Sequence, residues 1–346
     1  MRAVVFAGAG RVEVREVPDP EPLEPDDAIV RVAASGICGS DLHFLSGKAP
    51  LEPGDVMGHE AVGSIEAVGP AVGSVAVGDR VGVAFDVACG RCWFCERAQS
   101  QLCERLRILG GGIFGGGLPG TQAELVRVPV ADVNLLPLPP GVDDESGLFV
   151  GDVLATATAT AALAEPAHDE VVAVIGCGPV GCLVIQSLRA RGVRRILAFD
   201  RVADRLSLAT AAGAEAIDVD ARSPQMAAAA VTGDRGADVA IECVGHPDAF
   251  ETAIDIVRRG GRVVVAGMYA GESVEVQLGA WWARALDVRF VGLCPVHSWW
   301  RRGVDDLLAG RVDPVALVSH RLRLADAADG YRAFRERRAT KVVLRP

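Results

Sequence analysis

The feature that most restricts the fold is an alternation of strand-like and helix-like segments between residues 154 and 292. Most of the segments between the strands are rich in Ala, Leu and Arg and have helical periodicity. Six apolar runs fit strands that are buried on both faces: VVAVI, RILAF, AIDV, DVAIE, RVVVA and VRFVG. This alternation predicts a parallel sheet with helices on both faces, and six strands suit a doubly wound α/β domain.

The rest of the chain is predicted to form a second, mostly-β domain. Residues 1–153 contain short β-like runs, such as AIVRVAAS, AVGSIEAVG and DRVGVAF, separated by turns. Residues 293–346 hold two helix-like segments and a closing strand, KVVLRP. They are too short for a domain of their own, so we expect them to return to the first domain. The predicted domains are therefore 1–153 with 293–346, and 154–292.

Composition argues against several classes of protein. The net charge is −10, and no basic block of the kind found in nucleic-acid-binding proteins is present. The N-terminus lacks the apolar stretch of a signal peptide, and no apolar run approaches the about 18 residues of a membrane span. Nine cysteines, four of them clustered, favour metal binding in a reducing compartment. We expect a cytoplasmic protein with no nucleic-acid or membrane partner.

The clustered cysteines have the spacing of a metal site. The segment CGRCWFCERAQSQLC arranges them as C-x2-C-x2-C-x7-C, at Cys89, Cys92, Cys95 and Cys103. Four thiolates complete the tetrahedral coordination of Zn²⁺ and leave no position open to a substrate. Such a zinc ion would fix a loop that has little core. An iron–sulfur cluster also uses four cysteines and is the competing interpretation.

The first apolar strand leads into a glycine-rich turn and a helix, in VVAVIGCGPVGCLVIQSL. The turn and the start of the helix comprise Gly176, Gly178, Pro179, Val180 and Gly181. This context predicts a pyrophosphate at the helix N-terminus, as in a dinucleotide site. Asp200 would accept hydrogen bonds from the ribose and repel a 2′-phosphate, which favours NAD over NADP. Arg201 and Arg205 could instead accommodate a phosphate, or simply form a solvated helix face.

Four further residues have side chains that bind metals, but none is strong evidence alone. They are Cys38, His59, Glu60 and Asp152. A single cysteine is usually a small core residue, and a single histidine is more often hydrogen-bonded than metal-bound. Cys38, His59 and Asp152 lie far apart in the sequence, so their spacing does not predict that they meet.

The motif GHE-x2-G-x5-G, which begins at Gly58, resembles the signature of zinc-containing alcohol dehydrogenases of the medium-chain dehydrogenase/reductase family. The preceding CGSDLH, the cysteine lobe, the glycine-rich turn and the closing helices follow in the order of that family over essentially the whole chain. The resemblance implies a GroES-like, mostly-β catalytic domain interrupted by a Rossmann domain that binds NAD. It also implies two zinc ions per subunit and a homodimer or homotetramer.

The resemblance assigns a catalytic zinc to Cys38, His59 and Asp152, with Glu60 as a conditional fourth ligand. Asp152 stands where a second cysteine occurs in the two-cysteine alcohol dehydrogenases, as in bacterial branches of the family. An oxygen ligand donates less charge than a thiolate, so the zinc should be a stronger Lewis acid. Asp41 resembles the carboxylate that orients the histidine ligand.

Other positions also match functional residues of the family. Ser40 and His43 match a proton relay, since the alcohol must lose a proton before hydride can leave. Phe85 matches a pocket wall. Further matches concern the cofactor: Arg205 at the ribose, Val244, Gly245, Ala266 and Gly267 at strand ends lining the crevice, and Lys341 at the pyrophosphate.

The resemblance implies hydride transfer between a small-molecule alcohol, or an aldehyde or ketone, and NAD, as in class EC 1.1.1.-. Polyol, threonine and formaldehyde dehydrogenases of the same family are alternatives, and FVGLCPVHSWW resembles the bacterial formaldehyde-dehydrogenase-like branch. A non-catalytic NAD-binding protein is the alternative from another class. A zinc-free quinone reductase would lack both the GHE motif and the cysteine lobe.

Overall fold

The computed structural model describes residues 1–22, 24–48 and 50–346. The chain forms two compact units: Met1–Ala155 with Leu293–Leu308 and Pro314–Pro346, and Thr156–Gly292 with Ala309–Asp313. These units depart from the expected domains at residues 154–155 and 309–313. The short return of 309–313 to the second unit has a local cause, because the Gln186 carboxamide oxygen accepts the Asp313 N–H at 2.6 Å.

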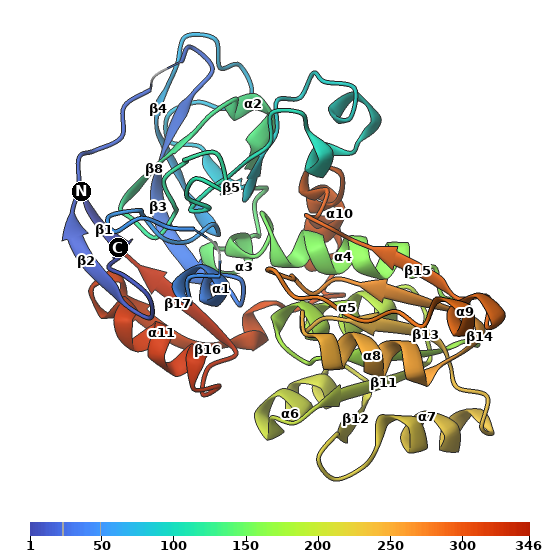
Figure 1. Cartoon of the computed structure of the whole chain (residues 1–346). Coiled ribbons are helices and arrows are strands. Elements are labelled where there is room, and N and C mark those ends of the chain that lie inside the picture. The colour runs from blue at the N-terminus through green and yellow to red at the C-terminus, as the bar shows by residue number, and fades with distance from the viewer. Residues whose placement is uncertain (23, 49) are drawn as a thin grey trace. The chain divides into compact units, whose positions relative to one another are not determined.

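A six-stranded parallel sheet forms the second unit, in the order β12-β11-β10-β13-β14-β15 (Figure 1). The strands are β10 (Val171–Ile175), β11 (Arg195–Asp200), β12 (Glu215–Asp218), β13 (Ala237–Glu242), β14 (Val257–Val265) and β15 (Asp287–Phe290). All six predicted strands are present. The doubly wound α/β class predicted from the alternation is confirmed.

Five helices accompany this sheet. They are α5 (Pro179–Ala190), α6 (Ala203–Ala211), α7 (Pro224–Thr232), α8 (Pro247–Ile256) and α9 (Leu278–Ala283). Phe250 and Ile254 of α8 pack with Phe199 and Ile217 of the strands in one buried apolar cluster. Every residue of β10 is buried, which explains why its sequence is apolar at consecutive rather than alternate positions.

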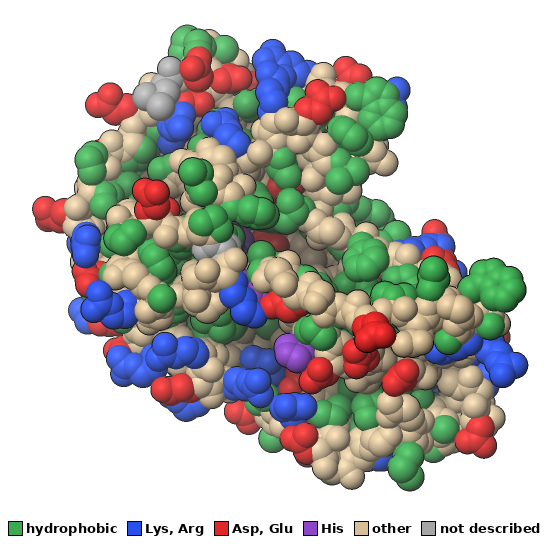
Figure 2. Space-filling view, in the orientation of Figure 1, with side chains coloured by type: hydrophobic (Ala, Val, Ile, Leu, Met, Phe, Trp, Pro, Cys, Tyr) green, Lys and Arg blue, Asp and Glu red, His purple; other side chains and the backbone are tan. Residues whose placement is uncertain are grey.

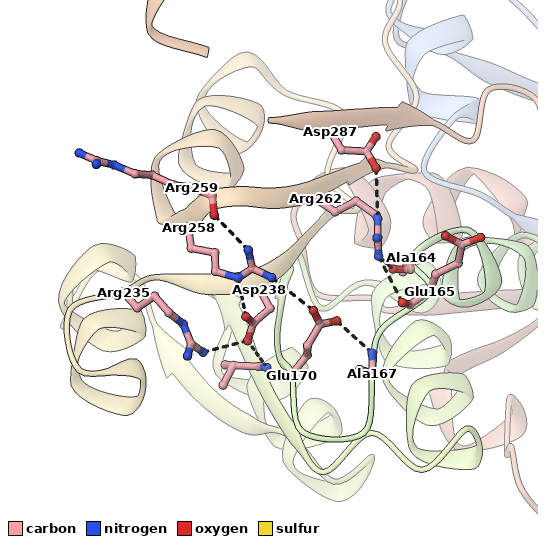
Figure 3. Close-up of polar contacts among 11 residues, drawn as sticks. Ala164, Glu165, Ala167, Glu170, Arg235, Asp238, Arg258, Arg259, Arg262 and Asp287 are labelled. Atoms are coloured by element: carbon pink, nitrogen blue, oxygen red, sulfur yellow. Dashed lines mark hydrogen bonds and ion pairs between the residues drawn. The ribbon is translucent and has the colours of Figure 1, made fainter. Parts of the chain in front are cut away.

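Charged side chains join the ends of the central strands in the second unit. Figure 3 shows Asp238, at the start of β13, between the guanidinium groups of Arg235 and Arg258. The Nε atom of Arg258 lies 2.6 Å from Oδ1 of Asp238. Arg262 of β14 donates to the carbonyl oxygen of Ala164, at the end of a preceding helix. These contacts tie the sheet to the segments that lead into it.

The first unit is built on a seven-stranded sheet in the order β16-β17-β3-β4-β5-β9, with β8 also paired to β3. Its strands are β3 (Ala28–Ile37), β4 (Ala61–Val68), β5 (Arg80–Val83), β8 (Leu125–Val128), β9 (Leu135–Pro137), β16 (Val318–Arg323) and β17 (Lys341–Arg345). Two smaller antiparallel pairs are β1 (Arg2–Phe6) with β2 (Val12–Glu16), and β6 (Asp86–Val87) with β7 (Arg107–Ile108). The closing segment KVVLRP thus contains an interior strand, β17, paired with β16 and β3 (Figure 1).

Short helices connect these strands. They are α1 (Asp41–Leu45), α2 (Ala131–Asn134), α3 (Asp144–Leu148), α10 (Val296–Leu308) and α11 (Ala327–Arg335), and α4 (Val153–Leu163) begins in the first unit and ends in the second. Four 3₁₀ turns are η1 (Cys95–Arg97), η2 (Ser100–Leu102), η3 (Val315–Leu317) and η4 (Leu324–Asp326). Tyr331 and Phe334 of α11 pack on Ile37 and Leu344 of the sheet. This packing buries the apolar stripe of α11 and holds the C-terminal segment in the first unit.

Acidic and basic side chains are interspersed over the face seen in Figure 2. Within the described ranges, no helix is both long and apolar enough to span a bilayer.

Candidate functional site

The four clustered cysteines lie together in a lobe of the first unit. Their sulfur atoms all lie within 4.8 Å of one another. Backbone N–H groups of Cys89 and Arg105 donate to Sγ of Cys103, both at 3.3 Å. Burial opposes ionisation of Cys89, but hydrogen bonds, first from the backbone of Arg91, lower the pKa of this thiol to about 6. Amides aimed at sulfur stabilise thiolates, so the donor set suits a thiophilic cation such as Zn²⁺.

His297 of α10 anchors this lobe and was missed by the sequence analysis. Its Nδ1 lies 2.8 Å from the Ser100 hydroxyl, and its Nε2 lies 2.8 Å from Oδ1 of Asn134. Asn134 also accepts the N–H of Ala88 through the same oxygen. Burial lowers the pKa of His297 to about 4, so the ring is neutral. A single histidine in a helix gives no sequence signal for this role, because its partners lie far away in the chain.

A second group of possible metal ligands also meets in the first unit: Cys38, His59, Glu60 and Asp152, with all ligand atoms within 4.8 Å. Cys38 follows β3, His59 and Glu60 immediately precede β4, and Asp152 lies between α3 and α4. The Nε2 atom of His59 lies 3.3 Å from Oδ2 of Asp152, and Sγ of Cys38 lies 4.0 Å from the same oxygen. The sheet therefore brings together ligands that are far apart in the sequence.

The electrostatics of this cluster suit a bound cation. Burial raises the pKa of the Cys38 thiol and of the Glu60 carboxyl. Burial also acts to lower the pKa of His59, but Asp41 and Asp152 raise it well above its ordinary value. Among the described residues, Oε1 of Glu60 has no hydrogen-bond partner. Several buried acidic groups need positive charge beside them, and the thiol, imidazole and carboxylate donors fit zinc.

Asp41 fixes the orientation of the His59 ring. Oδ1 of Asp41 lies 3.1 Å from Nδ1 of His59, and Oδ2 accepts the N–H of Cys38 at 2.9 Å. The other ring nitrogen, Nε2, therefore faces Asp152. The hydroxyl of Ser40 lies 3.4 Å from Nε2, and the ring of Phe85 meets the His59 ring edge-on at 5.9 Å between centroids.

His43 lies in α1, on the same short helix as Asp41, and its side chain is half-buried. The structure thus gathers the predicted relay pair, the predicted pocket wall and the four predicted ligands in one unit. Their roles stay predictions.

Lys341 does not have the position that the sequence analysis expected. Its side chain is fully buried, its amino group forms an ion pair with Glu60, and its Nζ lies 5.4 Å from the centroid of the Phe149 ring. A contact between Lys341 and a pyrophosphate is therefore not supported, because the amino group is enclosed and already paired. Lys341 lies in the last strand of the chain, and its burial could not be predicted from the sequence.

The glycine-rich turn in the second unit has the geometry that requires its glycines. Gly176 has a φ of +92°, and a Cβ on Gly181 would lie 1.9 Å from the carbonyl oxygen of Gly176. A Cβ on Gly178, the N-cap of α5, would meet nothing within 4 Å. Pro179 and Val180 form the first turn of α5. The helix N-terminus is thus open beside a tightly packed turn, as a phosphate site requires.

Asp200 ends β11 beside this turn. Its Oδ2 accepts the N–H of Cys177 at 2.8 Å, and its Oδ1 accepts the N–H of Arg201 at 2.7 Å. The side chain of Arg201 is exposed, 3.9 Å from Asp220. Arg205 is half-buried, and its Nε has no hydrogen-bond partner in the part of the chain that the structure describes. The carboxylate of Asp200 is therefore fixed next to the turn, and Arg201 and Arg205 follow it in the sequence.

Glu242, at the end of β13, is a residue that the sequence analysis missed. Its Oε1 accepts the N–H groups of Val244 and Gly245, at 2.5 and 2.8 Å. Its backbone oxygen accepts the N–H groups of Ala266 and Gly267, at 2.8 and 3.1 Å. Glu242 thus joins the two strand ends that were predicted to line the cofactor. A glutamate at a strand end resembles an ordinary surface residue, so it gave no signal.

Two models of known protein families match separate stretches of the chain. A model described as "Alcohol dehydrogenase GroES-like domain" matches residues 24–140, and one described as "Zinc-binding dehydrogenase" matches residues 179–307. Over its full length the chain is 39% identical to a probable zinc-binding alcohol dehydrogenase of Mycobacterium tuberculosis, 89% of which is covered.

Two solved structures are similar throughout. Alcohol dehydrogenase TADH from Thermus sp. ATN1 is 41% identical, with a TM-score of 0.95 and coverage of 100% of this chain and 99% of that one. A protein of Sinorhizobium meliloti assigned as a zinc-binding dehydrogenase, and solved with NADP bound, is 32% identical. Its TM-score is 0.86, with coverage of 100% and 99%.

Proposed function

The chain belongs to the zinc-dependent alcohol dehydrogenases of the medium-chain dehydrogenase/reductase family, and we propose that it transfers a hydride between a small alcohol and NAD. Members of this family are oxidoreductases. The proposal rests on one observation: the ligand atoms of Cys38, His59 and Asp152 lie close together in the first unit, with Glu60 alongside. In the proposed reaction the alcohol loses a hydride from carbon and a proton from oxygen, which gives a carbonyl compound, reduced NAD and a proton.

Cys38, His59 and Asp152 would hold a zinc ion, and Glu60 would be a conditional ligand because it is paired with Lys341. When bound, Zn²⁺ supplies a Lewis acid for the substrate oxygen, and NAD supplies the hydride acceptor. Cys89, Cys92, Cys95 and Cys103 would hold a second zinc ion with a purely structural role.

The chain's own residues orient the site and move the proton. Asp41 accepts from Nδ1 of His59 and thereby directs Nε2 toward the other ligands. We assign the first proton acceptor to Ser40, whose hydroxyl lies beside that nitrogen. His43, half-buried on the same helix, would then release the proton to water. Phe85 would supply an apolar wall for the substrate carbon chain.

The second unit is proposed to bind NAD. The pyrophosphate would lie over the N-terminus of α5, near Gly176, Gly178 and Gly181. The fixed carboxylate of Asp200 would accept hydrogen bonds from the ribose and disfavour a 2′-phosphate. The S. meliloti relative was solved with NADP bound, so a binding experiment must compare the affinities of this chain for NAD and NADP.

We further propose a homodimer or homotetramer in the cytoplasm. β15 is an edge strand of its sheet, and its last residue, Phe290, is 66% exposed, while Trp282 of the preceding helix α9 is 82% exposed. Exposed apolar groups at a sheet edge favour pairing with a second copy. Within the described residues no two cysteines form a disulfide, which suits a reducing compartment. Light scattering coupled to size-exclusion chromatography would test the oligomeric state.

The proposed reaction is tested by NAD reduction over a panel of simple alcohols, polyols and formaldehyde, together with zinc analysis of the purified protein. We expect the absorbance of reduced NAD to increase with at least one alcohol of the panel. Zinc analysis should find about two zinc ions per subunit. Zinc-replete protein that binds NAD yet reduces it with no member of the panel would contradict the proposal. About one zinc ion per subunit, retained in Asp152→Ala, would contradict the assignment of the Cys38 cluster.

A further inference from the structure

The side chain of Gln122 is fully buried in the first unit, next to the segments that carry the proposed catalytic-zinc ligands. Its backbone is fixed on both sides, since its N–H donates to the carbonyl of Met57 at 3.0 Å and its carbonyl accepts the N–H of Val4 at 2.8 Å. The sequence analysis assigned no role to this residue. A buried glutamine must satisfy two donor hydrogens and an acceptor oxygen within the protein.

The hydrogen-bond partners determine which way the carboxamide points. Nε2 of Gln122 lies 2.9 Å from the carbonyl oxygen of Gly36 and 3.3 Å from Oδ2 of Asp41. A carbonyl oxygen and a carboxylate oxygen only accept, so the amide nitrogen must face them. Each of its two hydrogens then has one partner. The carboxamide oxygen is left to face the opposite side.

Tyr331 of α11 occupies that opposite side. Its hydroxyl lies 2.9 Å from Oε1 of Gln122, and its side chain is buried. Because Oε1 only accepts, the phenol must donate. A connected series therefore follows: Tyr331 donates to Gln122, Gln122 donates to Asp41, and Nδ1 of His59 donates to the same carboxylate.

The space for Gln122 is created by a glycine directly before His59. Gly58 has a φ of +86°, and a Cβ at this position would lie 2.4 Å from Cγ of Gln122. Any larger residue at position 58 would therefore displace the glutamine. The packing of Gln122 and the path of the backbone into His59 depend on each other.

We propose that Gln122 and Tyr331 are positioning residues for the catalytic metal ligand His59, which they reach through Asp41. Gln122 holds the carboxylate of Asp41 by a hydrogen bond and links it to the end of β3, which leads to Cys38. Tyr331 holds the Gln122 carboxamide in the one orientation that permits this. The inference rests on the proposed function, since it takes the ion held by His59 to be the catalytic zinc.

The test measures zinc release rather than turnover. Wild-type protein and the variants Gln122→Met and Tyr331→Phe are mixed with a chromogenic zinc chelator, and the release of each of the two zinc ions is followed. Asp152→Ala, which lacks a ligand of the Cys38 cluster, identifies the phase that belongs to that cluster. Thr160→Val is the matched control: it removes a buried hydroxyl that donates within α4 to the carbonyl of Thr156.

We expect Gln122→Met to accelerate release of the catalytic zinc by about 10- to 100-fold. Tyr331→Phe should accelerate it by about 3- to 10-fold, because it removes one neutral hydrogen bond. The double variant should release zinc no faster than Gln122→Met, since Tyr331 acts only through Gln122. The phase from the cysteine lobe should not change in any of them, and Thr160→Val should change neither phase.

Wild-type release rates in both Gln122→Met and Tyr331→Phe overturn the inference, even if their melting temperatures are lower. If Gln122→Met does not fold, Tyr331→Phe decides, because it removes a single oxygen atom. A wild-type protein that releases zinc only from the cysteine lobe refutes the proposed metal site, and this inference with it. Two zinc ions in the wild type, with unchanged release in the variants, refutes the inference alone.

Discussion

Oδ2 of Asp152 lies 3.3 Å from Nε2 of His59, although His59 precedes β4 and Asp152 follows α3, far along the chain. Both side chains are largely shielded from solvent, with exposures of 13% for Asp152 and 7% for His59. At this distance the carboxylate either pairs with an imidazolium or shares a cation with a neutral imidazole. The two states differ in metal content, which makes Asp152 the most informative residue to change.

Replacing Asp152 by alanine should abolish turnover while NAD binding is largely retained. The change removes one of three protein ligands from the proposed catalytic zinc, and we expect kcat to fall by at least about a thousandfold. Zinc analysis should show a loss of about one ion per subunit. Dissociation constants for NAD, measured by calorimetry, should change by less than about threefold, because the glycine-rich turn is in the other unit.

Asp152→Cys is the matched control, because it restores a zinc ligand of the kind found in the two-cysteine alcohol dehydrogenases. It should retain about two zinc ions per subunit. Full activity in Asp152→Ala, or in His59→Ala, would refute the assignment of the site.

Replacing Cys95 by serine should remove the structural zinc without touching the site of reaction. The lobe between β6 and β7 has a small apolar cluster, so its order depends on the metal. We expect the loss of about one zinc ion and a fall in melting temperature on the order of 10 °C. Limited proteolysis should cut between residues 89 and 106. Cys182→Ser is the control, because this thiol lies outside the lobe and donates to the carbonyl of Cys177 in the second unit. Unchanged protease resistance in Cys95→Ser would contradict a structural role.

Replacing Asp200 by asparagine should shift the cofactor preference toward NADP. The change removes the negative charge next to the turn but keeps an acceptor for the N–H of Cys177. We expect the ratio of the dissociation constants for NAD and NADP to rise by about 10- to 100-fold, since one close charge is removed. Calorimetric titration of both cofactors measures this ratio. The control is Asp255→Asn, which changes an exposed residue of α8. An unchanged ratio in Asp200→Asn would contradict the proposal that Asp200 sets the preference for NAD.

The parts of the site that could be predicted from the residues themselves are those that a short segment builds alone. Gly176 and Gly181 are required by backbone geometry within one turn, and that requirement is visible as a motif. The lobe that includes Cys95 is visible for the same reason, because its four ligands lie within one loop. The parallel sheet was predictable because strands buried on both faces leave continuous apolar runs in the sequence.

Residues whose partners lie far away in the chain could not be found in this way. His59 and Asp152 were identified through the family resemblance, since no local spacing joins them. Gln122 binds Gly36 and Asp41, and Glu242 binds the end of β14, and only the folded chain brings these groups near. Lys341 was assigned to the cofactor because it matches a family position, and its sequence context gives no sign that its side chain is buried.

Asp238 provides a pH-dependent test of how the second unit is held together. Burial acts to raise the pKa of this carboxyl, but the N–H of Val171 and the guanidinium groups of Arg258 and Arg235 outweigh it and lower the pKa below its ordinary value (Figure 3). A lowered folded-state pKa means that the ionised carboxylate stabilises the fold above its unfolded pKa of about 3.9. This contribution is lost as the pH falls through the folded-state pKa.

Asp238→Asn should therefore lower the free energy of unfolding by about 1–3 kcal/mol at pH 7, because it removes the nearer carboxylate partner of Arg258 and leaves only the more distant Glu170. The difference from the wild type should shrink as the pH falls below about 4, where the wild-type carboxylate is itself being protonated. Urea denaturation at a series of pH values measures both effects. Asp234→Asn removes the same charge from an exposed position of the same unit and should change the free energy by less than about 0.5 kcal/mol. A difference for Asp238→Asn that stays constant from pH 7 to pH 3 would mean that shape, rather than charge, accounts for the stabilisation by this residue.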